Sequence, residues 1–476
     1  MTSDILQQAE TLRQRFRYPP DLAYREIKTP FFCGKLLYFD GLLDQKELDN
    51  AVLRPLTEKN EPFSPTFDSL LGILSYAGNL KELPLSDCET ALLSGSAILF
   101  TSACIVEIAA KKFVERAVAE PPTSTVIKGP REGFVENVKT NCVLLRRRIK
   151  SSELVLEEYK KGDRTSTKIV LAYLNDIVPA GVVQAIKAKL DEIDLDGIAD
   201  SSFLTKTLED RPYSLFKQVG NSEKPDVIAL KLLDGKVAVL CDGSPIVLYV
   251  PFALIEDFED AQDVYKRPVR TTVLRYMRLL GAFLALLAPA LFVAIQVYQF
   301  EILPVELMIT VINSTGNIPF SPTLEMLIAL VLFEILGEAS IRMPRHVGMA
   351  LGVVGAIVLG ETAVQAGILS SLTVLVVAMS GIGLYAVPDE AGTVGSLRLL
   401  FVICAGLLGL LGVLFCGMCV LAYASSLTSF GSPYLTPLAP IVKDDLKDLL
   451  VKYNLTDRPY RPSAFKLRNK LRLRRE

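Results

Sequence analysis

Histidine is almost absent from this chain of 476 residues, in which His346 is the only one. This scarcity removes most routes to histidine-based catalysis and to metal binding. The eight cysteines are scattered, and the close pair Cys416 and Cys419 lies in an apolar run, where we interpret both as packing residues rather than a redox or zinc site. A GxxxxGK[ST] phosphate loop and a nucleophile with a nearby base are also lacking, so we expect no enzymatic activity, no cofactor and no metal.

The chain has no excess of charge of one sign. Its net charge is −2, which gives no argument for nucleic acid as a partner. The start, MTSDILQQAETLRQRF, lacks the basic and then apolar pattern of a secretory signal, so we expect the N-terminal part to stay on the side of synthesis. Apolar residues make up 50% and charged residues 22% of the chain, an average that combines a polar first part with an apolar second part.

Long apolar runs begin only at Leu279. The clearest are Leu279 to Tyr298, Thr323 to Ile341, Val347 to Val387 and Leu397 to Leu427. Each of the first two is long enough to cross the hydrocarbon core of a bilayer as a helix, and the third is long enough for two passes. The sequence therefore predicts an α-helical polytopic membrane domain with four or five apolar segments.

Basic residues flank these runs and predict their orientation. They lie before the first run, after the second run and in the tail: Arg267, Arg270, Arg275, Arg278, Arg342, Arg345 and the segment from Arg458 to Arg475. The positive-inside rule places all three groups on the cytoplasmic face. Two ends on one side require an even number of crossings, so one segment is re-entrant or two are fused. The glycine-rich stretch from Val347 to Gly367 is the best re-entrant candidate.

The polar part contains an internal repeat. An apolar strand, a short turn and an amphipathic helix occur in Lys35 to Leu56 and again in Lys168 to Ile193. Two apolar strands around a tight turn occur in Leu92 to Ile108 and again in Leu232 to Val250. Both pairs recur at an offset of about 135 to 140 residues, which predicts two similar α/β subdomains, roughly 25–120 and 160–255.

These patterns divide the chain into four parts. We predict an N-terminal α/β subdomain with its linker over residues 1–125 and a second α/β subdomain over 126–270. A transmembrane domain is expected over 271–428 and a short basic cytoplasmic segment over 429–476. The expected fold class is thus an α/β cytoplasmic region followed by a helical membrane domain.

A basic motif runs from Lys128 to Lys150. A chain break at Gly129 and Pro130 is followed by an amphipathic helix that ends in three arginines. One interpretation is a solvated basic helix, and the other is a contact with another subunit or with anionic lipid headgroups. The residues that would make such a contact are Arg131, Glu132, Arg146, Arg147 and Arg148.

Carboxylates interrupt the second apolar run. Glu325 follows Ser321 and Pro322 and is explained by helix initiation, and Glu338 lies four residues before Arg342, a spacing at which the two pair. Glu334 lies near the middle, where an acidic side chain costs about 3 kcal/mol on insertion scales. It is therefore expected to face protein or water rather than lipid.

Four polar residues form two pairs at helical spacing in these runs. Glu334 and Glu338 share one helix face, and Glu361 and Gln365 form a similar pair in the next segment. We predict that the four line an ion pathway. The alternative interpretation is a structural hydrogen-bond network.

Several motifs in this order resemble the A-subunit family of spore germinant receptors, the GerA/SpoVAF family. They include GPREGFVE, KPDVIALKLLDGKVAVLCDGSP, VVGAIVLGETAVQAGILSS and SFGSPYLTPLAP, and the resemblance extends from about Leu22 to Pro462. Family members commonly carry Arg in LREA, whereas this chain has Gly337 at that position.

This resemblance implies a function in spore germination. Members lie in the inner membrane of bacterial spores, which here places both termini on the core side, and they work with a permease-like B subunit and a lipoprotein C subunit. The resemblance also implies that nutrients trigger release of monovalent cations and that A subunits form a ring-shaped, ion-conducting homo-oligomer in membrane lipid. A SpoVAF-type accessory protein that amplifies ion release, and a non-conducting scaffold for a sensor subunit, remain alternatives.

Overall fold

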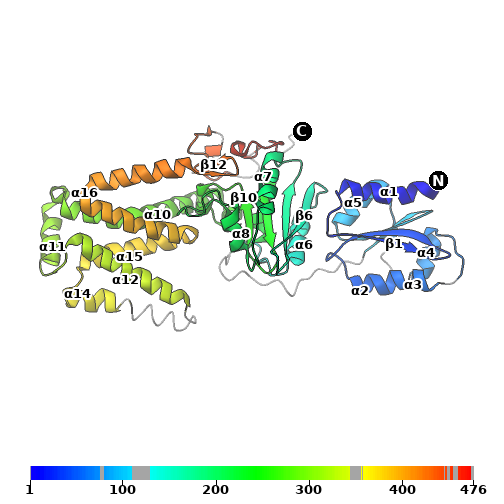
Figure 1. Ribbon diagram of the computed structural model, residues 1–476, viewed down its shortest axis with the longest axis horizontal. Coiled ribbons are helices and arrows are strands. Elements are labelled where there is room, and N and C mark those ends of the chain that lie inside the picture. The colour runs from blue at the N-terminus through cyan, green and yellow to red at the C-terminus, as the bar shows by residue number, and fades with distance from the viewer. Residues whose placement is uncertain are drawn as a thin grey trace.

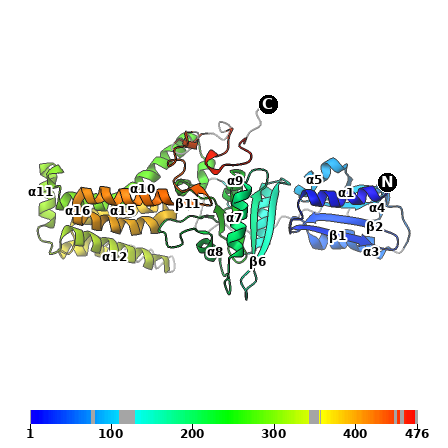
Figure 2. The same ribbon diagram turned by 45° about the horizontal axis from the view of Figure 1, so that its top comes forward.

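The chain forms an elongated molecule of three parts. The computed structural model describes residues 2–59, 61–74, 80–109, 129–342, 355, 357–443, 445–446, 451–453 and 459–472. The first α/β subdomain lies at one end, the second lies in the middle and a helical bundle lies at the other end (Figure 1). Figure 2 shows the long helices of the bundle running side by side.

The first subdomain is a five-stranded antiparallel sheet between two layers of helices. Its elements are α1 (Thr2–Arg15), β1 (Leu22–Lys28), β2 (Cys33–Phe39), α2 (Gln45–Leu48), η1 (Asp49–Leu53), α3 (Arg54–Glu58), α4 (Phe67–Ile73), β3 (Leu80–Glu82), α5 (Leu85–Leu93), β4 (Ala97–Thr101) and β5 (Ile105–Ile108). The strand order is β1-β2-β4-β5-β3. Alternate residues of β2 enter opposite cores: Leu36 joins the core with α2 to α4, and Leu37 joins the core with α1 and α5.

The second subdomain repeats this plan. Its elements are α6 (Val138–Arg148), β6 (Leu154–Lys161), β7 (Thr167–Leu174), α7 (Ala180–Asp191), α8 (Ser201–Leu208), β8 (Gly220–Ser222), α9 (Pro225–Leu233), β9 (Val237–Cys241) and β10 (Val247–Val250). The strand order β6-β7-β9-β10-β8 matches that of the first sheet. The two sheets thus agree with the predicted repeat. The structure extends it beyond the predicted bounds of 25–120 and 160–255, because the arginine-rich helix α6 takes the place of α1.

The apolar part folds into helices that pack along one another. They are α10 (Pro268–Val297), α11 (Val305–Thr315), α12 (Pro322–Arg342), α14 (Ala363–Gln365), α15 (Ser371–Tyr385) and α16 (Ala391–Ser426), with the short turns η4 (Phe300–Ile302), η5 (Val358–Thr362) and η6 (Pro388–Glu390). Among the described residues, two helices are long and apolar enough to cross a membrane, Pro268–Val297 and Pro388–Ser426. The count of four or five membrane segments stays a prediction. Residues 347–354 and 356 of the predicted re-entrant stretch, including Gly348 and Gly352, lie outside the described residues, as do His346 and Arg345.

Helix α16 is a hairpin rather than one straight rod. The backbone leaves the helical region at Gly409, where φ is +63° and ψ is −143°. A Cβ placed on Gly417 would lie 3.9 Å from the Phe401 ring, although a straight helix would separate these positions by about 24 Å at 1.5 Å per residue. Both ends of the hairpin contact the second subdomain: Thr393 Oγ1 donates to the Leu215 carbonyl at 2.9 Å, and Arg211 donates to Ser426 Oγ at 3.0 Å.

The C-terminal segment packs on the second subdomain. After the short strands β11 (Thr428–Ser429) and β12 (Ser432–Pro433), the chain returns to the end of α9, where Arg461 Nε donates to the Leu233 carbonyl at 2.8 Å. Arg472 forms an ion pair with Asp234, and the Lys236 ammonium lies 4.7 Å from the centre of the Phe465 ring. The described part of the basic tail, up to residue 472, therefore packs with the α/β subdomains. We call the two subdomains and this tail the soluble half.

Candidate functional site

A charged centre joins four helices of the apolar part. Arg398 of α16 is fully buried, pairs with Glu334 of α12 and donates to Ser380 Oγ of α15 at 2.8 Å. Ser380 in turn donates to the Ala285 carbonyl of α10 at 2.7 Å. An arginine at this depth requires a carboxylate and further acceptors, because an isolated buried charge is costly. The centre therefore fixes the relative positions of α10, α12, α15 and α16.

Glycines allow the helices to approach closely enough for these contacts. A Cβ at Gly395 would lie 2.9 Å from Glu334 Oε1, so the carboxylate occupies the space over that glycine. A Cβ at Gly383 would lie 2.3 Å from the Gly281 carbonyl oxygen, which places the backbones of α15 and α10 in contact. Small residues at membrane helix interfaces have this effect in general.

Glu334 is buried only in part. Arg398 contacts its Oε1, while 42% of the Glu334 side-chain surface is exposed on the single chain. Sequence reasoning singled out Glu334 but missed Arg398 and Ser380. A charged residue at the start of the apolar run from Leu397 is the signal that points to Arg398.

The other predicted pathway residues form local pairs. Glu338 pairs with Arg342 at 2.6 Å, as the spacing predicts, and both side chains are exposed. Gln365 donates to Glu361 at 3.3 Å, and both are exposed. Helix α14, which contains Gln365, lies at the end of the bundle farthest from the soluble half, whereas α12 ends nearer to it (Figure 1). The structure therefore does not bring the two pairs together.

Glu325 connects two helices in addition to its place at the start of α12. Its side chain is buried, and Oε1 accepts the Ser370 backbone N–H at 2.6 Å. Ser370 is the N-cap of α15, where a negative charge is favoured by the helix dipole. The predicted helix-initiating residue thus also ties α12 to α15.

Arg146 in the basic motif binds the first subdomain. It is 2% exposed, pairs with Asp21 through two hydrogen bonds, one of them 2.9 Å from Nη2 to Oδ1, and lies 4.3 Å from the centre of the Phe39 ring. The charge of Arg146 is therefore neutralised by Asp21 within the same chain, at the contact between the two subdomains.

The rest of the motif lies nearer the surface. Arg148 and Arg147 both pair with Glu132, at 2.8 Å and 3.5 Å, and Arg131 is exposed. A contact of these four residues with another subunit or with lipid headgroups stays a prediction.

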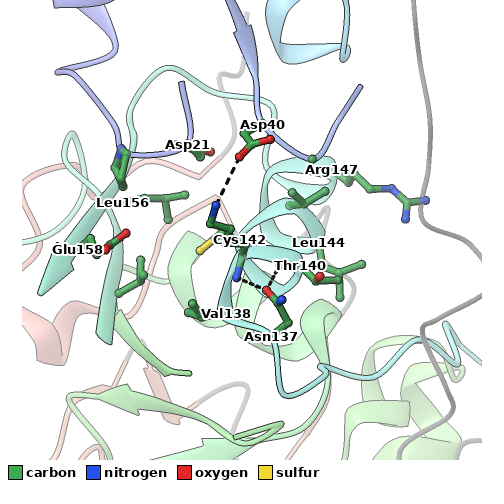
Figure 3. Close-up of a pocket in the computed structure, with 15 residues that line it drawn as sticks. Asp21, Asp40, Asn137, Val138, Thr140, Cys142, Leu144, Arg147, Leu156 and Glu158 are labelled. Carbon is green, nitrogen blue, oxygen red and sulfur yellow. Dashed lines mark hydrogen bonds and ion pairs between the residues drawn. The ribbon is translucent and has the colours of Figure 1, made fainter. Parts of the chain in front are cut away.

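A cavity of about 180 Å³ lies beside the Asp21–Arg146 pair, between the subdomains. Asp21 and Asp40 from the first subdomain face Cys142 and Glu158 from the second (Figure 3). Lys139 Nζ lies 3.6 Å from the Asp40 carboxylate across the gap. Burial raises the pKa of the Cys142 thiol well above its usual range, which disfavours the reactive thiolate form.

Comparison with known proteins gives the family. The model of the Bacillus/Clostridium GerA spore germination protein matches residues 10–464. Spore germination protein KA of Bacillus subtilis is 33% identical over 464 residues, which cover 95% of this chain and 85% of that protein. Spore germination protein GerLA of Bacillus cereus is 30% identical, with 96% of each chain covered.

A solved structure is also similar. The N-terminal domain of the A subunit of the Bacillus megaterium spore germinant receptor GerK3 is 25% identical, with a TM-score of 0.40, and the match covers 51% of this chain and 92% of that one. The family match over nearly the whole length, together with the extensive identity to GerLA and its relatives, shows that the chain belongs to the GerA family of spore germination proteins.

Proposed function

We propose that the chain is the membrane subunit of a spore germinant receptor that answers nutrients by forming an oligomeric cation-conducting channel. Its expected location is the spore inner membrane, with both termini on the core side. A permease-like B subunit and a lipoprotein C subunit are the expected partners, and monovalent cations are the expected cargo. Membership of a spore germination family and the apolar helices support this assignment.

The observation that carries the channel proposal is the exposed side of Glu334. An ionised carboxylate in a membrane helix needs protein or water around it, because lipid exposure costs about 3 kcal/mol on insertion scales. Arg398 neutralises one oxygen, but 42% of the Glu334 side chain stays exposed on a single chain. A neighbouring copy that encloses a water-filled path would supply the missing environment, and carboxylates along it would favour cations over anions.

Glu334→Gln in intact spores tests the proposal. We expect slower nutrient-triggered release of potassium at an unchanged amount of protein in the inner membrane. Glu301→Gln is the matched control, because Glu301 is exposed in η4 and outside the charged centre. Unchanged release in Glu334→Gln spores would remove Glu334 from the pathway.

A double variant separates conduction from stability. Glu334→Gln leaves the buried Arg398 without its carboxylate, so a purely structural effect would also lower release. Glu334→Gln combined with Arg398→Met removes both charges. If Glu334 acts only as a structural partner, the double variant restores the protein level and the release that Glu334→Gln lowers. If Glu334 lines the path, release stays low in the double variant at a normal protein level.

Two other roles predict different phenotypes. A SpoVAF-type accessory protein would amplify ion release triggered by any receptor, whereas a receptor subunit is needed only for its own nutrients. Spores that lack this chain distinguish the two when they are tested with nutrients sensed by other receptors. A scaffold would tolerate Glu338→Gln, and Glu334→Gln combined with Arg398→Met, with unchanged release.

A further inference from the structure

Three segments of the chain meet at the junction between the soluble half and the helical bundle. They are η2 (Leu254–Phe258), which precedes α10, η6, which connects α15 to α16, and the segment that follows β12. Asp257 of η2 is 8% exposed, Glu390 of η6 is 3% exposed and Tyr434 after β12 is fully buried. Ionisable groups from segments far apart in the sequence are thus enclosed together.

The two carboxyl groups are neighbours in this enclosed space. Asp257 and Glu390 interact with each other, and Lys217 Nζ lies 2.5 Å from Asp257 Oδ1. Asp257 Oδ2, Glu390 Oε1 and the Tyr434 hydroxyl have no hydrogen-bond partner among the described residues. Two ionised carboxylates only accept hydrogen bonds, so a bond between them requires one proton.

The charges around the pair favour that proton. Lys217 is the cation that contacts Asp257, and it balances only one of the two carboxylates. Among the described residues, the other titratable groups that interact with Asp257 or Glu390 are acidic or phenolic: Asp389, Tyr249 and Tyr434. Burial and the neighbouring Glu390 side chain raise the pKa of Asp257 to about 8.

We propose that Asp257 and Glu390 form a proton-binding site that holds one shared proton at neutral pH and connects the soluble half to the start of α16. Loss of the proton leaves two buried negative charges facing each other with one lysine beside them. Because Ala391 begins α16 directly after Glu390, the resulting repulsion acts on the first turn of the hairpin. This inference does not depend on whether the protein conducts ions.

Infrared difference spectroscopy of the full-length protein in lipid nanodiscs tests the site. The wild type is expected to show the carbonyl stretch of a protonated carboxyl at pH 7 and to lose it at pH 9. Asp257→Asn and Glu390→Gln should each remove this band. Asp389→Asn is the control, because it removes a nearby negative charge outside the shared pair, and it should keep the band. Absence of such a band in the wild type at pH 7, or its persistence in both pair variants, would overturn the proposal.

A salt titration distinguishes a proton from a metal cation as the ligand. At constant pH 7, potassium or calcium chloride should leave the band unchanged. Loss of the band on addition of either salt would show that a metal ion competes for the carboxyl oxygens, and this would refute a dedicated proton site. Hydrogen exchange provides a second measurement at pH 9. Amides of residues 391–395 should exchange faster in the wild type than in Glu390→Gln, and equal rates would refute the effect on α16.

Discussion

The ion pair between the two α/β subdomains gives the sharpest prediction of stability. Asp21→Asn removes the charge that neutralises Arg146 but keeps nearly the same shape and one acceptor oxygen. Arg146 is 2% exposed and makes two hydrogen bonds to Asp21, so the variant leaves a buried guanidinium without a carboxylate. Loss of one partner of a buried pair costs about 3 to 5 kcal/mol. Because asparagine still accepts one bond, we expect a loss of about 3 kcal/mol.

A second Arg–Asp pair in the first subdomain provides the control. Arg25 lies 3.0 Å from Asp49, and their side chains are 45% and 48% exposed. Exposed pairs contribute about 0.2 to 1 kcal/mol, so Asp49→Asn should be nearly neutral. Asp21→Asn combined with Arg146→Met should cost less than Asp21→Asn alone, since no charge is then buried without a partner.

Hydrogen exchange of the full-length protein measures the effect where it arises. A loss of about 3 kcal/mol in local stability speeds exchange by a factor of about a hundred or more, since each 1.36 kcal/mol is tenfold. We expect this change in the amides of α6 and β1 for Asp21→Asn, and less than a sixfold change for Asp49→Asn. Equal effects of the two variants would refute the reasoning that burial gives the Asp21–Arg146 pair its strength.

Three further variants test the helical part. Gly409→Ala should lower the thermal stability and the amount of inserted protein. Alanine there must adopt φ +63°, and its Cβ would lie 2.9 Å from side-chain atoms just after the end of α10. Gly392→Ala, with open space around it, should lower neither quantity. Holding alanine at φ +63° and ψ −143° alone costs about 1 to 3 kcal/mol. Gly383→Val should separate α10 from α15 and lower the midpoint of denaturation, while Gly337→Ala, which meets nothing within 4 Å, is expected to be neutral. Glu338→Gln breaks an exposed ion pair and should change that midpoint by less than the equivalent of about 1 kcal/mol.

The duplicated soluble half was predictable because its signals are local. Short apolar strands with turns between them recur at a constant offset, and the two sheets have the same strand order. Helix α6 was harder to assign, since three successive arginines read as a solvated or lipid-facing surface. The role of Arg146 depends on Asp21, which lies 125 residues earlier, and no local pattern reveals such a partner.

The helical part was predictable in composition but less so in its path. Apart from Arg398 near its start and two serines near its end, the run from Leu397 to Leu427 is apolar, so hydropathy does not mark Gly409 as the place where the chain reverses. Its length of more than 30 residues, which exceeds one crossing of about 20, is the signal for a hairpin. Glu334 was recognised because a mid-helix carboxylate is costly. Its partner lies in another helix, and only the packed structure brings the two together.

The return of the C-terminal segment to the second subdomain constrains how the protein is made. The sheet of that subdomain is complete at Val250, long before the ribosome reaches Leu467, whose side chain lies against Gly235. Domains fold from the N-terminus as synthesis proceeds, so this surface stays uncovered while the helices between are synthesised. Docking of the tail therefore follows the synthesis of α16, whose hairpin brings the chain back to the second subdomain.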